Sequence, residues 1–178
     1  MKAQLKEKLS KIKIIFMDID GVLNDGRVVF HGGESPKTWY VRDRLGMMIM
    51  KRRKDPDIKL VWISGRQSSE LETRAQELGV DDVFSDVEDK LKIMKEVLSG
   101  YGLEFSDAMY IGDDIIDIGC MEKAGVSCCP RDAAEDIREM ADYVSTCDGG
   151  RGAVREIIEE ILRARGEWKE IVESFKET

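Results

Sequence analysis

Basic residues are fewer than acidic ones in this sequence, which also has a single histidine and no long apolar run. Asp and Glu outnumber Lys and Arg by 36 to 28, for a formal net charge of −8, so we exclude nucleic acid as a partner. The apolar runs fall far short of the ~20 residues that cross a bilayer, and we expect no membrane segment. Hydrophobic residues still make up 42% of the chain, enough for one globular domain over residues 1–178.

The cysteines lack the spacing of a metal site. Cys120, Cys128, Cys129 and Cys147 contain no Cys-x-x-Cys pair, and the histidine, His31, is far from them in sequence. This spacing disfavours zinc. Because no secretion signal is visible, we expect reduced thiols in a cytoplasmic protein.

Short apolar runs, each followed by turn residues and a helical pattern, recur along the chain. They predict strands over Lys13–Met17, Lys59–Ile63, Asp82–Phe84, Ala108–Ile111 and Gly125–Cys129. Repeated β-α units of this kind favour an α/β fold, a three-layer Rossmann-like parallel sheet with helices on both faces.

Four further segments have patterns of their own. Helices are predicted from a cap at Ser68 or Ser69 to Leu78, and over Lys90–Leu98. Residues 27–42 alternate apolar and polar side chains about a Gly-Gly turn, which predicts a β-hairpin insert after the first strand. Residues 152–178 predict a C-terminal helix and then a tail from Gly166 with no evident core to join.

Acidic and other polar residues follow the predicted strands. In open parallel sheets, ligands bind beyond the carboxyl ends of the strands, so we expect these residues to gather at one rim. They are Asp18 and Asp20 after the first strand, Ser64, Gly65 and Arg66 after the second, Lys90 at the helix after the third, and Gly112, Asp113, Asp114 and Asp117 after the fourth.

Such a cluster predicts phosphoryl transfer. The carboxylates would repel one another unless a hard divalent cation lay among them, and oxygen ligands suit Mg²⁺. Asp18 could then attack phosphorus, while Ser64, the following amides and Lys90 hold the phosphate oxygens. Asp20, two residues on, could protonate the leaving oxygen and later activate water. We therefore expect a magnesium-dependent phosphatase of a small phosphate ester.

Two other kinds of aspartate-containing site fit this sequence less well. A calcium-binding EF-hand would need glycine at its sixth position, where Leu23 stands, and glutamate at its twelfth, where Val29 stands. A receiver domain would carry its phosphorylated aspartate on a middle strand, without a late Gly-Asp-Asp.

Four segments, in order along the chain, resemble the four motifs of the haloacid dehalogenase superfamily. They are Asp18-Ile-Asp-Gly-Val, Ser64, Lys90 and Gly112-Asp-Asp-Ile-Ile-Asp117. The resemblance implies that Asp18 is the nucleophile and Asp20 the acid/base. It also implies that Asp18, the backbone carbonyl of Asp20 and Asp113 hold Mg²⁺, with Asp114 and Asp117 in support.

The spacing resembles the capless branch of that superfamily. Only 46 positions separate Asp18 from Ser64 and 26 separate Ser64 from Lys90, which leaves no room for a cap domain. The hairpin, the Arg66 to Arg74 segment and the glycine-rich residues 149–156 resemble its sugar-acid phosphatases. That implies 3-deoxy-D-manno-octulosonate 8-phosphate as the substrate, recognition of it by Arg66 and Arg74, and assembly as a homotetramer.

Three positions depart from that subgroup, which usually has Thr at the places of Asn24 and Ser64 and Gly at the place of Arg44. Ser64 keeps the hydroxyl, but Asn24 and Arg44 lie near the expected substrate entrance, so a nine-carbon sugar-acid 9-phosphate stays open as the substrate. Arg66 favours the eight-carbon sugar acid, because some nine-carbon enzymes have an acidic residue there.

Two further functions stay open. A noncatalytic tetramerisation domain, like those related to cytidylyltransferase fusions, would not need the complete motif set. A phosphomutase would use the same aspartyl-phosphate intermediate, but without a cap that intermediate would meet water.

Overall fold

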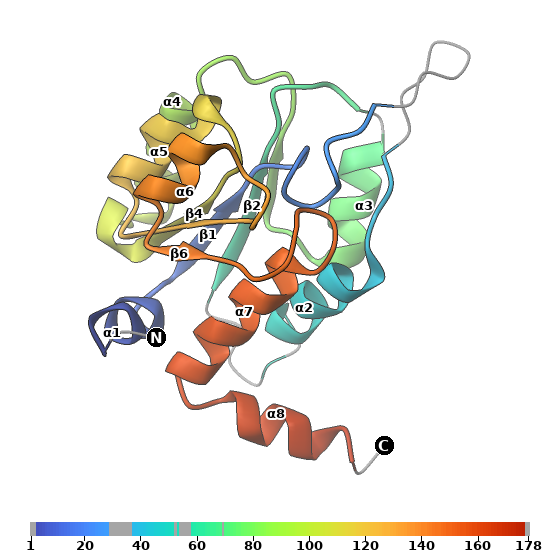
Figure 1. The fold of residues 1–178 in the computed structure, drawn as a ribbon, viewed down its shortest axis with the longest axis vertical. Coiled ribbons are helices and arrows are strands. Elements are labelled where there is room, and N and C mark those ends of the chain that lie inside the picture. The colour runs from blue at the N-terminus through green and yellow to red at the C-terminus, as the bar shows by residue number, and fades with distance from the viewer. Residues whose placement is uncertain (1–2, 29–36, 52, 54–57, 69, 177–178) are drawn as a thin grey trace.

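The computed structural model describes residues 3–28, 37–51, 53, 58–68 and 70–176, which form a parallel sheet between layers of helices (Figure 1). The order of the strands across the sheet is β3-β2-β1-β4-β5-β6. Their bounds are β1 Ile14–Met17, β2 Lys59–Ile63, β3 Asp82–Phe84, β4 Ala108–Ile111, β5 Val126–Cys129 and β6 Tyr143–Val144. The central strand β1 therefore lies between β2 and β4.

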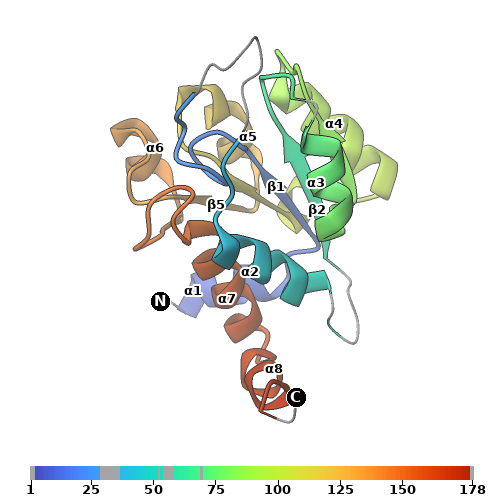
Figure 2. The same ribbon diagram turned by 90° about the vertical axis from the view of Figure 1, so that its right-hand side faces the viewer.

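Helices cover both faces of the sheet (Figures 1 and 2). One layer contains α1 (Ala3–Ser10), α2 (Val41–Lys51), α3 (Glu70–Leu78) and α7 (Ala153–Ala164). The other contains α4 (Lys90–Tyr101), α5 (Ile118–Lys123) and α6 (Glu135–Met140). Short 3₁₀ turns, η1 (Phe105–Asp107) and η2 (Ile115–Asp117), flank β4, and α8 (Trp168–Ser174) extends beyond α7.

Strands β1 and β4 carry hydrophobic side chains along their whole length because both of their faces are buried. In β1, Ile15 and Met17 pack in the core beneath α2, α3 and α7, whereas Ile14 and Phe16 pack in the core beneath α4, α5 and α6. The predicted three-layer α/β class is thus confirmed. None of the described helices is long and apolar enough to span a membrane.

The structure extends one predicted helix and adds one short strand. The helix that begins at Lys90 continues past Gly100 to Tyr101, because the left-handed residue that ends it is Gly102, with φ of +65°. The two-residue strand β6 was not predicted, since it is too short to show a period of alternation.

The predicted hairpin over residues 27–42 lies mostly at 29–36, outside the described residues. In the described part, residues 37–40 form no strand and Val41 begins α2, so the end of the predicted hairpin is wrong. The helix forms there because it buries Met47 and Met50. In addition, Asp43 in its first turn accepts hydrogen bonds from the N–H groups of Gly152 (3.1 Å) and Arg155 (2.8 Å) at the start of α7.

The expectation that the tail after Gly166 has no core to join is also wrong. Trp168 and Ile171 of α8 pack against the core beneath α7. The guanidinium groups of Arg155 and Arg163 lie over the Trp168 ring, 5.4 and 5.2 Å from its centroid. These cation–π contacts hold α8 on α7.

Candidate active site

The strand register brings the predicted motif residues to one edge of the sheet. Met17 of β1 lies opposite Trp62 of β2 and opposite Ile111 of β4, so the chain leaves three neighbouring strands at the same edge. The next residues there are Asp18, Ser64 after Ile63, and Gly112. The N–H of Asp18 donates to the Ile111 carbonyl at 3.0 Å, which fixes the start of the first motif against β4.

A buried lysine lies between two of the carboxylates. Lys90, the first residue of α4, places its Nζ 3.0 Å from Asp18 Oδ2 and 2.8 Å from Asp117 Oδ1. All three side chains are at least 94% buried, with exposed fractions of 4%, 6% and 0% for Lys90, Asp18 and Asp117. Burial favours the neutral amine, but the two carboxylates outweigh it and raise the pKa of Lys90.

The carboxylates are more numerous than the cations that pair with them. Oxygen atoms of Asp18, Asp113 and Asp117 lie within 4.8 Å of one another. Burial and the charge of Asp117 raise the pKa of Asp18 to about 6, despite the proximity of Lys90. Burial, with the charges of Asp18 and Asp117, raises the pKa of Asp113 to about 8. Three crowded oxygen donors with an uncompensated negative charge fit a hard divalent cation.

Two glycines allow the carboxylates to lie so close to the backbone. Gly21 has φ of +89°, and a Cβ atom there would collide with the carboxylate of Asp113. A Cβ on Gly112 would lie 2.5 Å from Cβ of Asp117. The cluster therefore requires glycine at both positions.

Asp20 points to a different set of partners. Its carboxylate accepts a hydrogen bond from Asn24 Nδ2 at 2.7 Å, and both of its oxygens lie 2.6 Å from Lys37 Nζ. Burial opposes ionisation, but Asn24, Lys37 and the nearby charge of Arg66 outweigh it and hold the pKa of Asp20 below its usual value. The Lys37 side chain is 6% exposed and that of Asp20 is 23% exposed, so this ion pair is partly shielded from water.

The turn after β2 brings the predicted phosphate-binding residues next to this loop. Ser64 is buried, and its Oγ accepts a hydrogen bond from the Arg66 N–H at 3.1 Å, across the exposed Gly65. Arg66 is exposed and lies close enough to Asp20 to affect its pKa. Asp114 is also exposed, and its Oδ1 accepts the Ile115 N–H at 2.7 Å.

Arg74 lies among different neighbours on α3. Its Nη1 is 2.6 Å from Glu77 Oε2, and its guanidinium lies 5.7 Å from the centroid of the Trp39 ring. Trp39 in turn stacks on Trp62, with centroids 5.4 Å apart. Among the contacts described for this residue, none joins it to the carboxylate cluster.

Comparison with known proteins identifies the family. Residues 82–158 match the haloacid dehalogenase-like hydrolases. The chain is 34% identical to the 3-deoxy-D-manno-octulosonate 8-phosphate phosphatase of Escherichia coli (strain K12), over 94% of this chain and 88% of that protein. It is also 34% identical to the Haemophilus influenzae enzyme, over 91% of this chain and 89% of that one. The chain belongs to this phosphatase family.

Solved structures agree with this assignment. A Moraxella catarrhalis 3-deoxy-D-manno-octulosonate 8-phosphate phosphatase in complex with magnesium, phosphate and the free sugar acid has a TM-score of 0.93 and 34% identity, over 98% of this chain and 99% of that one. A cobalt-bound enzyme from Haemophilus influenzae has a TM-score of 0.85 and 34% identity, over 90% and 93% of the two chains. Both the superfamily and the phosphatase class expected from the motifs are confirmed.

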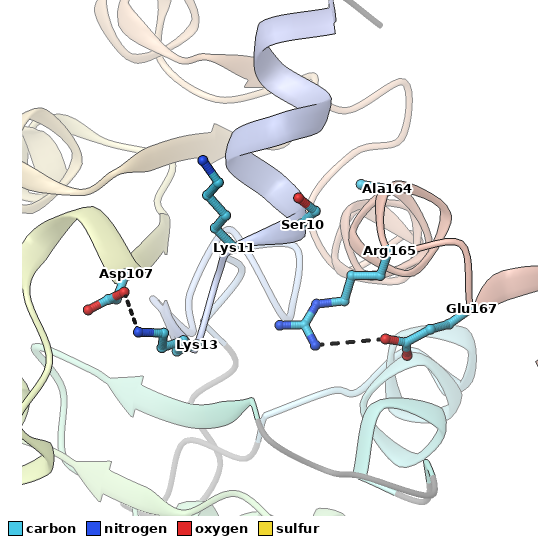
Figure 3. A pocket seen from close by; sticks show the side chains of 7 residues that line it. All are labelled: Ser10, Lys11, Lys13, Asp107, Ala164, Arg165 and Glu167. Atoms are coloured by element: carbon cyan, nitrogen blue, oxygen red, sulfur yellow. Dashed lines mark ion pairs between the residues drawn. The ribbon is translucent and has the colours of Figure 1, made fainter.

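A separate cavity of about 630 Å³ opens at the other end of the sheet (Figure 3). Lys13 and Asp107 in its wall precede β1 and β4, so it lies at the amino ends of these strands, away from the motif residues. Four of its charged groups form pairs, Lys13 with Asp107 at 2.9 Å and Arg165 with Glu167 at 3.8 Å, and Lys11 pairs with Glu7 at 2.7 Å. This cavity contains none of the motif residues, so the carboxyl edge stays the candidate active site.

Sequence patterns did not reveal Lys37 or Tyr110. Lys37 belongs to the segment that was predicted as a hairpin, where no motif distinguishes it. Tyr110 lies in an apolar strand, yet its hydroxyl donates to Asp117 Oδ1 at 2.8 Å. Its position two residues before Gly112 was the only available signal.

We predict that Mg²⁺ stabilises the protein more at about pH 8.5 than at about pH 5.5. Asp18 and Asp113 have pKa values raised in the folded protein, so the metal-free protein loses stability as the pH rises through about 6 and about 8. A cation that replaces these protons should stabilise by about 2.7 kcal/mol at roughly 100 times its dissociation constant. Thermal unfolding with and without Mg²⁺ measures this.

Asp113→Asn should reduce both the pH dependence of the protein's thermal stability and its stabilisation by Mg²⁺. Asp82→Asn is the matched control, because Asp82 bonds to Tyr101 at the edge of the sheet and not to the cluster. An Asp113→Asn protein with the full wild-type response to Mg²⁺ would contradict the metal site.

Proposed function

We propose that this protein hydrolyses 3-deoxy-D-manno-octulosonate 8-phosphate to the free sugar acid and inorganic phosphate, through an aspartyl-phosphate on Asp18. The observation that carries the proposal is the buried Asp18 carboxylate, held by Lys90 at the carboxyl edge of the sheet. The family assignment supports the substrate, since it rests on enzymes named for this reaction.

The donor set supports magnesium as the cofactor. Asp18 and Asp113 would hold it together with the backbone carbonyl of Asp20, and Asp117 lies within reach. When bound, Mg²⁺ would offset the repulsion between the phosphate and the attacking carboxylate. The carboxylates would then remain ionised near neutral pH, despite the raised pKa values of Asp18 and Asp113.

The chemistry has two steps. In the first, an oxygen of Asp18 attacks phosphorus, the bond from phosphorus to the sugar oxygen breaks, and Asp20 gives its proton to that oxygen. In the second, Asp20 takes a proton from water as the water attacks phosphorus, and the bond to Asp18 breaks. Lys90, Ser64 and the amide of Gly65 would hold the phosphate oxygens in both steps.

Recognition of the sugar acid is assigned to Arg66. Its exposure and its position near Asp20 would let it meet the substrate carboxylate. Substrate binding by Arg74 stays a prediction, because its guanidinium would have to leave Glu77 to contact the substrate.

The finer expectations about assembly and location are part of the same proposal. We propose a homotetramer, as the sequence resemblance implies, and action in the cytoplasm, which suits four free thiols. A nine-carbon sugar-acid phosphate remains the alternative substrate, and a noncatalytic tetramerisation domain the alternative function.

Asp18→Asn should abolish turnover, with a loss of at least about 10³-fold, because an amide cannot form the aspartyl-phosphate. Phosphate release from the eight-carbon substrate with Mg²⁺ measures this, and circular dichroism checks the fold. Asp82→Asn again serves as the control and should keep wild-type activity. If Asp18→Asn kept full magnesium-dependent activity, Asp18 would not be the nucleophile.

The eight-carbon substrate should have a higher kcat/KM than nine-carbon keto-acid phosphates and simple sugar phosphates assayed side by side. Arg66→Ala should lower kcat/KM for the eight-carbon substrate by about 10- to 100-fold, the effect of a lost charge-assisted hydrogen bond, and should change the simple esters little. Arg74→Ala, assayed in parallel, tests the second arginine. A preference for simple sugar phosphates would contradict the substrate and spare the mechanism, whereas no turnover of any ester would favour the noncatalytic alternative.

Lys37→Ala should move the alkaline limb of the kcat/KM pH profile to higher pH. Asp20 must be protonated to act as the acid, so activity falls as the pH rises above its pKa. Lys37 lowers that pKa, and removal of its charge should raise it. Lys37→Arg keeps the charge and should leave the limb near its wild-type position. An unchanged profile in Lys37→Ala would show that the limb does not report Asp20.

A further inference from the structure

Tyr110 contacts the candidate active site from the face of the sheet that α4, α5 and α6 cover. It belongs to β4, its ring packs in the core formed with α4, α5 and α6, and its side chain has no exposed surface. Its hydroxyl is directed at a carboxylate of the fourth motif, Asp117 Oδ1, at 2.8 Å. A buried hydroxyl needs a partner, but here the partner is a member of the carboxylate cluster.

Asp117 is held on both of its oxygens. Oδ1 accepts from Tyr110 and from Lys90 Nζ, each at 2.8 Å, and Oδ2 accepts from the Asp113 N–H at 3.1 Å. The same Lys90 ammonium is 3.0 Å from Asp18 Oδ2. Tyr110, Asp117, Lys90 and Asp18 thus form one continuous buried chain of hydrogen bonds.

We propose that Tyr110 is a positioning residue that acts through Asp117 to keep Lys90 aligned with Asp18, an inference that rests on the proposed phosphatase function. The hydroxyl satisfies part of the hydrogen-bonding capacity of Asp117 Oδ1, so that oxygen can share Lys90 with Asp18. Without the hydroxyl, Asp117 would depend on Lys90 alone at Oδ1 and would draw the ammonium away from Asp18. The phosphate-binding cation would then be misplaced for transfer.

The Tyr110→Phe variant removes the hydroxyl and keeps the ring. We expect kcat for the eight-carbon substrate to fall about tenfold while KM stays within about twofold, because misalignment affects transfer more than binding. A second measurement does not need turnover. Beryllium fluoride with Mg²⁺ mimics a phosphoryl group on an aspartate, and its affinity by calorimetry should fall about tenfold in Tyr110→Phe.

Tyr101→Phe is the matched control, because it removes a hydroxyl that donates to a carboxylate, Asp82 Oδ2 at 2.6 Å, at the sheet edge. It should leave kcat and beryllium fluoride affinity unchanged. Thermal unfolding of both variants allows all assays to be run well below their melting temperatures.

Each outcome decides the proposal. It is overturned if Tyr110→Phe keeps wild-type kcat and beryllium fluoride affinity, if activity falls only in proportion to the folded fraction, or if the variant does not fold, since the hydroxyl would then be structural. If the wild-type protein hydrolyses no phosphate ester but its affinity for beryllium fluoride depends on Tyr110, the phosphatase proposal fails and the positioning role stands.

Discussion

Electrostatic repulsion among two buried carboxylates and a half-buried one is the constraint on which the rest of the active site depends. Asp18, Asp113 and Asp117 share a small volume in which Lys90 is the cation within hydrogen-bond distance. Two unit charges 4 Å apart interact by about 4 kcal/mol at an effective dielectric of 20, which is a large part of a typical folding free energy. Burial and this imbalance of charge together raise the pKa values of Asp18 and Asp113. The site is therefore built to receive positive charge, from protons at low pH and from a metal ion otherwise.

The fold supplies this cluster with favourable backbone groups as well as with side chains. Lys90 is the first residue of α4, so the amino end of that helix, with its partial positive charge, lies on the same side as its ammonium group. The parallel register of β1, β2 and β4 ends three strands at one edge, and each adds a loop to the rim. Three elements that are distant in sequence thus converge at one rim.

The sequence predicted those parts of the molecule that depend on local pattern. Strands such as β1 and β4 are recognisable because burial on both faces makes them continuously apolar, and the motif residues follow them directly. The start of α2 at Val41 and the docking of Trp168 were mispredicted, because each depends on contacts with α7 that no local pattern contains. Lys37 and Tyr110 were not predicted for a similar reason. The role of each depends on a contact with a carboxylate that is distant in sequence or on another element.

The two aspartates of the first motif are perturbed in opposite directions, although only one residue separates them. Burial raises the pKa of Asp18, whereas Asn24 and Lys37 overcome burial and lower that of Asp20. The first chemical step needs the reverse, an ionised Asp18 and a protonated Asp20. Positive charge beside Asp18 would lower its pKa, and the negative charge of a phosphate near Asp20 would compete for Lys37 and raise the pKa of Asp20. The protonation states that the chemistry requires are thus favoured only when metal and substrate are both present, which is a physical reason for an open, capless site to remain inactive until it is filled.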